Sequence, residues 1–216
     1  MTDPVPERPS ERVAEIVDGY VARTIPIHVD VRAEQTVVSE PEADAILERA
    51  ETIALGPCGC RRDAGNCDAP IDVCLAIDVD AQDLAGEFEG FRIVSRAEAE
   101  AALRTSRAAG LVHLAYRRGD SPVTQFCSCC SCCCWFLDRL KAFDYHEAIV
   151  ESNYVARHDA DACIGCGTCV DRCHFGAWTN DAVSAPHLAI ERCFGCGVCA
   201  ASCPADAIAL VPRLEA

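Results

Sequence analysis

The sequence predicts an α+β protein in two parts. An N-terminal α/β region with cysteine-rich loops is expected over residues 1–150, and a small region rich in glycine and cysteine over residues 151–216. Helical spacing of apolar residues, interrupted by short β-rich runs, predicts the first part. An internal repeat predicts the second part, because Cys163–Cys173 matches Cys193–Cys203 with a period of 30 residues.

Helices and strands are expected to alternate along the first part. Ser39 and Glu42 form a capping-box pattern with Pro41 in the first turn, which predicts the start of a helix. An apolar stripe then predicts that this helix continues to Gly56-Pro57; the stripe comprises Ile46, Leu47, Ala50, Ile53 and Ala54.

A second capping box, formed by Ser95 and Glu98, predicts a helix that runs to about Ala109. Gly110 stands where a glycine commonly ends a helix. The remaining expected elements are helices over residues 13–21 and 136–143 and strands over residues 25–31, 91–94 and 111–117.

Composition and charge exclude several classes of protein. The formal net charge is −15, so the chain lacks the basic footprint of a nucleic-acid-binding protein. This charge suits solubility and mutual repulsion, or a redox partner with a basic docking face. The longest apolar run, Cys132–Leu137, is too short to span a membrane.

The 18 cysteines are expected to be reduced. The first twenty residues carry charges throughout and lack the apolar core of a secretory signal, which predicts a cytoplasmic protein. Cysteines at short regular spacing in that compartment are more often metal ligands than disulfide partners.

The repeated spacing C-x2-C-x2-C-x3-C suits iron–sulfur chemistry. Three cysteines two residues apart can wrap one loop around a cubane cluster, while the fourth lies past the loop and points elsewhere. The glycines between them permit the tight turns that this requires. Zinc sites usually use two C-x2-C pairs separated by a longer spacer, so the repeat favours two [4Fe-4S] clusters.

Residues from about Val155 to Val211 resemble the bacterial-type two-cluster, 2[4Fe-4S], ferredoxins. The resemblance implies that each cluster takes three ligands from one motif and the fourth from the other. The implied sets are Cys163, Cys166, Cys169 and Cys203 for one cluster, and Cys193, Cys196, Cys199 and Cys173 for the other. Pro204 follows the family pattern, whereas His174 replaces the proline expected after Cys173, which would alter the loop and the local potential.

Ten cysteines lie upstream of this repeat. Four of them, on an expected loop between a helix and a strand, read C-x-C-x6-C-x6-C: Cys58, Cys60, Cys67 and Cys74. They could bind a third [4Fe-4S] cluster or zinc, or remain free or redox-active thiols. Arg61 and Arg62 could offset thiolate charge, bind an anionic substrate or partner, or simply be surface charges.

The other six cysteines fall within the block Cys127–Cys134. Some could complete the site begun at Cys58, and others could form a redox-active dithiol or a non-cubane cluster. The alternative is that several are small buried residues under Trp135 and Phe136, because free cysteine packs well in cores. His113 is either a core or edge residue, a hydrogen-bond donor that tunes a cluster, or a proton donor.

Most of the chain past about residue 45 resembles a group of bacterial proteins known as 4Fe-4S dicluster proteins. The residues that carry this likeness are Cys58-Gly-Cys60-Arg61, Gly110-Leu-Val-His113 and the cysteine block. The resemblance implies an architecture and no activity. The chain shows no P-loop and no dinucleotide-binding motif, so neither NAD nor flavin is indicated.

The sequence therefore predicts electron transfer through two [4Fe-4S] clusters, between a donor and an acceptor protein. The N-terminal part would supply a third cluster, a docking platform or the final acceptor. One alternative is an iron–sulfur oxidoreductase whose catalytic site is built from the N-terminal cysteines. The other is a redox or iron sensor that changes partner when it loses a cluster.

Overall fold

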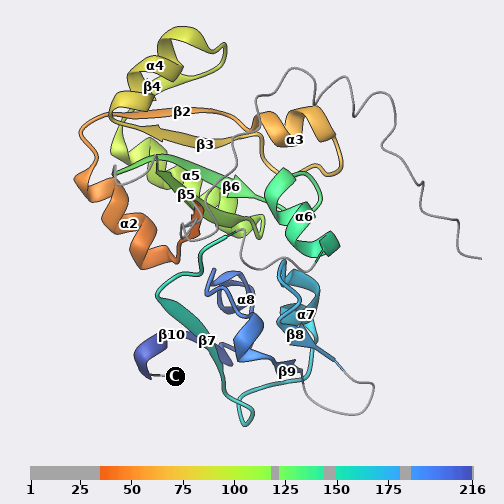
Figure 1. Cartoon of the computed structure of the whole chain (residues 1–216). Helices are drawn as coiled ribbons and strands as arrows, with labels where there is room; N and C mark the ends of the chain where they lie inside the picture. The colour runs from red at the N-terminus through yellow and green to blue at the C-terminus, as the bar shows by residue number, and fades with distance from the viewer. Residues whose placement is uncertain (1–34, 118–121, 144–148, 181–185, 216) are drawn as a thin grey trace, which may run out of the picture. The chain divides into compact units, whose positions relative to one another are not determined.

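Six strands form an antiparallel sheet (Figure 1), and most side chains of β2 and β5 are buried on both of its faces. The computed structural model describes residues 35–117, 122–143, 149–180 and 186–215. The strands lie in the order β1-β5-β6-β3-β2-β4. Their bounds are Gln35–Val37 (β1), Ile53–Pro57 (β2), Asp72–Ile77 (β3), Arg92–Val94 (β4), Val112–Arg117 (β5) and Val123–Cys129 (β6). The helix and strand expected before residue 34 lie outside the described residues.

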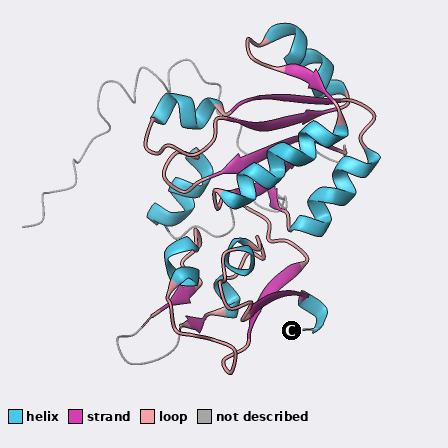
Figure 2. Cartoon of the chain, turned by 180° about the vertical axis from the view of Figure 1, so that it is seen from behind, coloured by secondary structure: helices cyan, strands magenta, loops and turns pink. Residues whose placement is uncertain are grey.

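Helices cover both faces of this sheet (Figure 2). Helices α2 (Glu40–Arg49) and α5 (Arg96–Ala108) pack on one face, where Leu47, Leu103 and Phe126 are almost completely buried. Helix α4 (Val79–Glu87) packs Ala81 against Ala54 and Ala76 on the opposite face. Helix α6 (Trp135–Phe143) packs against β5 and β6, and the short α3 (Gly59–Ala64) follows β2.

Both predicted capping boxes are present. Glu42 accepts hydrogen bonds from the backbone N–H and the hydroxyl of Ser39, at 2.8 and 2.7 Å. The Ser95 hydroxyl accepts from the N–H of Glu98, whose carboxylate accepts from the N–H of Ser95. Gly110 follows α5 with φ of +75°, the conformation that its place in the sequence predicts.

The first of these helices is shorter than the sequence predicts. It ends at Arg49, and Ile53 and Ala54 belong to strand β2, so the predicted extension to Gly56-Pro57 is wrong. The cause is a distant side chain, because Asp78 accepts hydrogen bonds from the N–H groups of Glu51 and Thr52. Those donors are therefore taken out of the helix, and the chain turns into the sheet.

The cysteine-bearing segment after β2 is also more regular than the predicted loop. Cys58 is the N-cap of α3, Cys60 lies inside that helix, and Cys74 lies within β3. Cys67 lies in the intervening loop. Pairing of Leu75 with Phe126 places Cys74 opposite Cys127 on the neighbouring strand β6.

The remaining elements are short, as the sequence predicts beyond Tyr154. Two hydrogen-bonded strand pairs, β7 with β10 and β8 with β9, flank two short helices. Their bounds are Tyr154–His158 (β7), Thr168–Arg172 (α7), Trp178–Thr179 (β8), His187–Leu188 (β9), Ile190–Arg192 (η2), Val198–Ala201 (α8), Ile208–Pro212 (β10) and Arg213–Glu215 (η3). No described helix is both long and apolar enough to cross a membrane.

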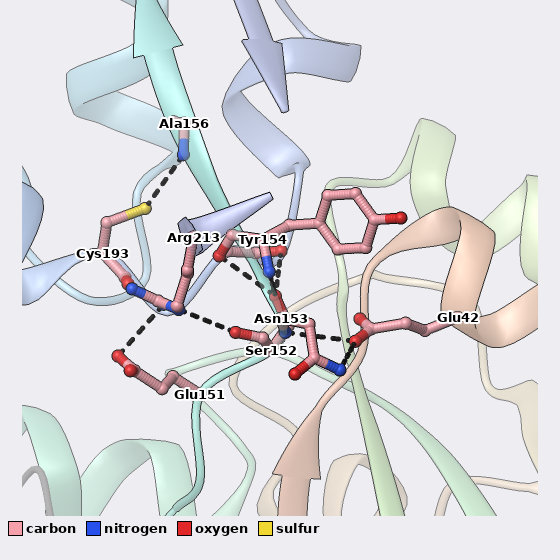
Figure 3. A network of polar contacts seen from close by, with 9 residues as sticks. Glu42, Glu151, Ser152, Asn153, Tyr154, Ala156, Cys193 and Arg213 are labelled. Atoms are coloured by element: carbon pink, nitrogen blue, oxygen red, sulfur yellow. Dashed lines mark hydrogen bonds and ion pairs between the residues drawn. The ribbon is translucent and has the colours of Figure 1, made fainter. Parts of the chain in front are cut away.

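Polar contacts join this region to the sheet, and all of them lie within the compact unit of residues 33–216. Glu42 of α2 accepts hydrogen bonds from the backbone N–H and the side-chain amide of Asn153 (Figure 3). Arg213 donates to the carbonyls of Ser152 and Cys193 and pairs with Glu151. A division between residues 150 and 151 stays a prediction.

Candidate metal centres

The two copies of the cysteine repeat form two similar loops, each followed by a short helix. Gly167 and Gly197 precede α7 and α8 with φ near +74° and +80°, so each loop turns sharply before the third cysteine of its motif. Gly195 must also be small, because a Cβ there would lie 2.0 Å from the carbonyl oxygen of Tyr154. Cys169 and Cys199 occupy matching helical positions and are both buried.

The thiol of Cys173 lies beside the cysteines of the other repeat. Burial raises the pKa of Cys199 to about 12, and the nearby Cys193 and Cys173 add to this rise. Burial likewise raises the pKa of Cys196, and the nearby thiols of Cys199, Cys173 and Cys193 add to this rise. The fourth cysteine of the first motif therefore faces the second motif.

The first three cysteines form the other group. Burial raises the pKa of Cys169, and Cys163 and Cys166 are the neighbouring thiols that add to it. Cys203, the last cysteine of the second motif, packs against an apolar cluster that contains Cys169 of the first motif as well as Cys193 and Cys199 of its own. The two motifs are thus interleaved in space.

The surroundings of these sulfurs suit anionic cluster ligands. Backbone N–H groups of Gly165, Ala177 and Ala156 donate to sulfur, at 3.4, 3.3 and 3.5 Å respectively. Their acceptors are Cys163, Cys173 and Cys193. Hydrogen bonds of this kind stabilise thiolates and tune cluster potentials. All 18 cysteines lie in the described part of the chain, and all are free.

Eight free thiols in two interleaved groups are the donor set of an iron–sulfur protein. Residues 162–208 match the family model described as a 4Fe-4S dicluster domain. The C-terminal part of the chain is therefore such a domain and binds two [4Fe-4S] clusters. A search among curated proteins finds no match to this chain.

The ten upstream cysteines separate into two groups. Cys67 joins three residues of the cysteine block, and the four sulfurs lie within 4.8 Å of one another; we call this the tetrathiol site: Cys67, Cys130, Cys132 and Cys133. The other six form a connected group that we call the six-thiol set: Cys58, Cys60, Cys74, Cys127, Cys129 and Cys134. The four cysteines that the sequence grouped together are therefore divided. Cys67 belongs to the tetrathiol site, whereas Cys58, Cys60 and Cys74 belong to the six-thiol set.

The six-thiol set lines a cavity of about 370 Å³. Contacts run from Cys58 to Cys74, on to Cys127 across the strand pair, and then to Cys129. Hydrogen bonding from Cys129 lowers the pKa of Cys134 to about 6 despite its burial. Backbone N–H groups at the start of α6 and the charge of Arg61 contribute to this lowering. Tyr116 and Phe136 also line this cavity, as do Cys130 and Cys133 of the tetrathiol site, and the sequence alone did not single out Tyr116.

Arg61 is not a surface charge. Its side chain is 1% exposed, and it donates to the carbonyls of Pro70 and Ser128 and to the sulfur of Cys130. It also lines the six-thiol cavity, so one guanidinium serves both groups of cysteines. Arg62 is exposed, as expected for a surface charge.

The two histidines noted in the sequence have different surroundings. His113 is 3% exposed beside Phe126 and Ser128, and burial together with Arg107 lowers its pKa to about 3. A ring that is neutral at pH 7 in this position fits the core interpretation.

His174, the departure from the ferredoxin pattern, is a structural link. Its Nε2–H donates to the carbonyl of Gly110 at 2.8 Å, which leaves Nδ1 as an acceptor. Nδ1 then accepts from the backbone N–H and the hydroxyl of Ser131. A proline at this position would remove both contacts, so the histidine ties the residue after Cys173 to the cysteine block.

Proposed function

We propose that this protein transfers electrons, one at a time, between a donor protein and an acceptor protein in the cytoplasm. The observation that carries the proposal is the interleaving of the two motifs, in which Cys173 lies among Cys193, Cys196 and Cys199. When bound, each [4Fe-4S] cluster accepts and releases one electron. Interleaved ligand sets support a short distance between two clusters.

The proposed ligands are those of the crossed arrangement. One cluster is held by Cys163, Cys166, Cys169 and Cys203, and the other by Cys193, Cys196, Cys199 and Cys173. The first set is nearer the surface, since Cys166 is exposed whereas Cys193 and Cys199 are buried. Ile164, between two of its cysteines, is 67% exposed, while the matching Phe194 is 6% exposed. This asymmetry supports docking of partners at the first motif.

Four single substitutions test the crossing. We expect Cys199→Ser and Cys173→Ser to lose the same cluster, so both should retain about four irons per chain. The surviving cluster should show the same potential and the same spectrum by electron paramagnetic resonance. Cys169→Ser and Cys203→Ser should form the second matched pair, with the other cluster surviving.

The ligand assignment would be contradicted if the cluster that survives in Cys173→Ser had the same potential or the same spectrum as the cluster that survives in Cys169→Ser. Electron transfer itself is tested on anaerobically purified protein. It requires that the clusters be reduced and reoxidised reversibly and that the reduced protein pass electrons to an acceptor protein. Failure of either step with all eight irons present would overturn the proposal.

The cavity lined by the six-thiol set favours a second candidate, an oxidoreductase. In that case the C-terminal clusters would deliver electrons to a site in this cavity, either a third iron–sulfur cluster or a pair of thiols. Tyr116 and Arg61 would then face the reacting groups. Substrate turnover that disappears in Cys74→Ser, while the two C-terminal clusters remain, would distinguish this candidate from a plain electron carrier.

A further inference from the structure

Four sulfurs outside the C-terminal domain converge on one point. Cys67 comes from the loop between α3 and β3, and the other three come from the turn between β6 and α6. The sulfur of Cys67 lies 3.7 Å from that of Cys130 and 3.7 Å from that of Cys133. The sulfurs of Cys132 and Cys133 are 3.8 Å apart.

These distances suit a single ion. Zinc binds four thiolates tetrahedrally with bonds of about 2.3 Å, which places neighbouring sulfurs about 3.8 Å apart. A cubane places four irons between its ligands, so its thiolate sulfurs stand farther apart than this. Among the described residues, no other group of three or more cysteine, histidine or carboxylate ligands is as close. The C-terminal cysteines, which bind cubanes, are thus more widely spaced.

The surroundings also fit a metal bound by four thiolates. The Arg61 guanidinium lies 3.5 Å from the sulfur of Cys130, where its charge offsets the excess negative charge of four thiolates around a divalent ion. The side-chain amide of Asn66 donates to the carbonyl of Cys132 at 2.7 Å, which fixes the loop against the turn. Val73 and Leu111 are buried against Cys130 and Cys133. Partners of this kind orient metal ligands.

We propose that the tetrathiol site binds one zinc ion, which fastens the loop before β3 to the turn after β6. Cys67 and Cys130 are 63 residues apart in the sequence, so the ion closes a long loop. Four protein ligands leave no open coordination position, as in structural zinc sites. Zinc does not change its valence, so the site is independent of the electron transfer proposed above. It also removes Cys67 from any third iron–sulfur cluster.

Metal analysis of the full-length protein, purified without oxygen, tests the proposal. We expect about one zinc per chain beside the iron of the two cubanes. The double variant Cys67→Ser/Cys132→Ser should lose at least nine-tenths of the zinc and keep its iron and acid-labile sulfide. Cys60→Ser is the matched control, because it removes an exposed cysteine of the six-thiol set and should keep the zinc.

Cobalt substitution gives a readout that does not depend on a stable variant. We expect cobalt in the wild-type site to show intense thiolate-to-metal charge-transfer bands and the visible bands of tetrahedral coordination. Absence of zinc from the wild-type protein, or undiminished zinc in the double variant, would overturn the proposal. An iron content near twelve per chain in the wild-type protein that falls to about eight in the double variant would also overturn it, because this result would indicate that the site binds a third cubane.

Discussion

Arg61 is the residue on which the N-terminal cysteines depend most. It is buried, its guanidinium satisfies two carbonyls, and it lies beside Cys130 of the tetrathiol site. Loss of such a side chain leaves buried acceptors without donors and removes a cation that lies beside these sulfurs. Charge balance and backbone geometry therefore depend on the same side chain.

Replacement of Arg61 by methionine should destabilise the protein by about 3 kcal/mol, because buried acceptors lose their donors. The thermal midpoint of the holoprotein, measured without oxygen, should then fall by roughly 6–12 °C. Arg62→Met is the matched control, since Arg62 is exposed on the same helix, and its effect should stay within about 0.5 kcal/mol. Equal effects of the two changes would show that Arg61 does not have this role.

The 4Fe-4S dicluster domain could be predicted from the sequence because the spacing of its cysteines is local and repeated. The tetrathiol site could not, because the pairing of β3 with β6 brings Cys67 to the cysteine block. The burial of Arg61 was missed for the same reason. Its neighbour Arg62 has the same chemistry, and only the tertiary structure distinguishes the two.

At the scale of elements, local signals were reliable where the stabilising contacts are also local. Helix α5 begins at its capping box and ends before Gly110, as the sequence predicts. The end of α2 depends instead on Asp78, which lies more than twenty residues further along the chain. A stripe of apolar residues cannot reveal that a distant carboxylate will take two of the backbone donors.

The start of α2 carries a pH-dependent contribution to stability. Burial raises the pKa of Glu42, but hydrogen bonds from Ser39 and Asn153 outweigh it, so the folded-state pKa lies below the usual 4.5. A lowered folded-state pKa stabilises the protein above the unfolded value, and this stabilisation is lost as the pH falls through the folded value.

Glu42→Gln should therefore lower stability by about 1–2 kcal/mol at pH 7, because charged acceptors form the stronger hydrogen bonds. The difference in thermal midpoint between wild type and variant should shrink as the pH falls below 4.5, the usual value for this carboxyl. Glu48→Gln on the exposed face of the same helix serves as the control and should show no such trend. A difference that is constant with pH would contradict the role given to the Glu42 carboxylate.

At the scale of the whole molecule, a net charge of −15 favours partners with basic surfaces. Asp159 and Asp161 are exposed in the loop that leads to Ile164, where we propose that partners dock. Attraction between opposite charges speeds encounter and weakens as salt screens it.

Electron transfer from the reduced protein to a basic acceptor protein should slow about tenfold or more between low salt and roughly 0.3 M salt. Stopped-flow absorbance of the clusters measures this rate. An uncharged small-molecule acceptor should show little dependence on salt, which controls for changes in the clusters themselves. A rate to the basic protein that rises with salt would place the docking surface elsewhere.

The order of the strands bears on how the protein is made. Every strand of the six-stranded sheet, and all four thiols of the tetrathiol site, lie between Gln35 and Cys133. Because a chain is synthesised from its N-terminus, this part can fold while the C-terminal cysteines are still in the ribosome. Ser131 and Gly110, the anchors for His174, are then in place before the last cluster ligands emerge. The dicluster domain would thus fold against a sheet that has already formed.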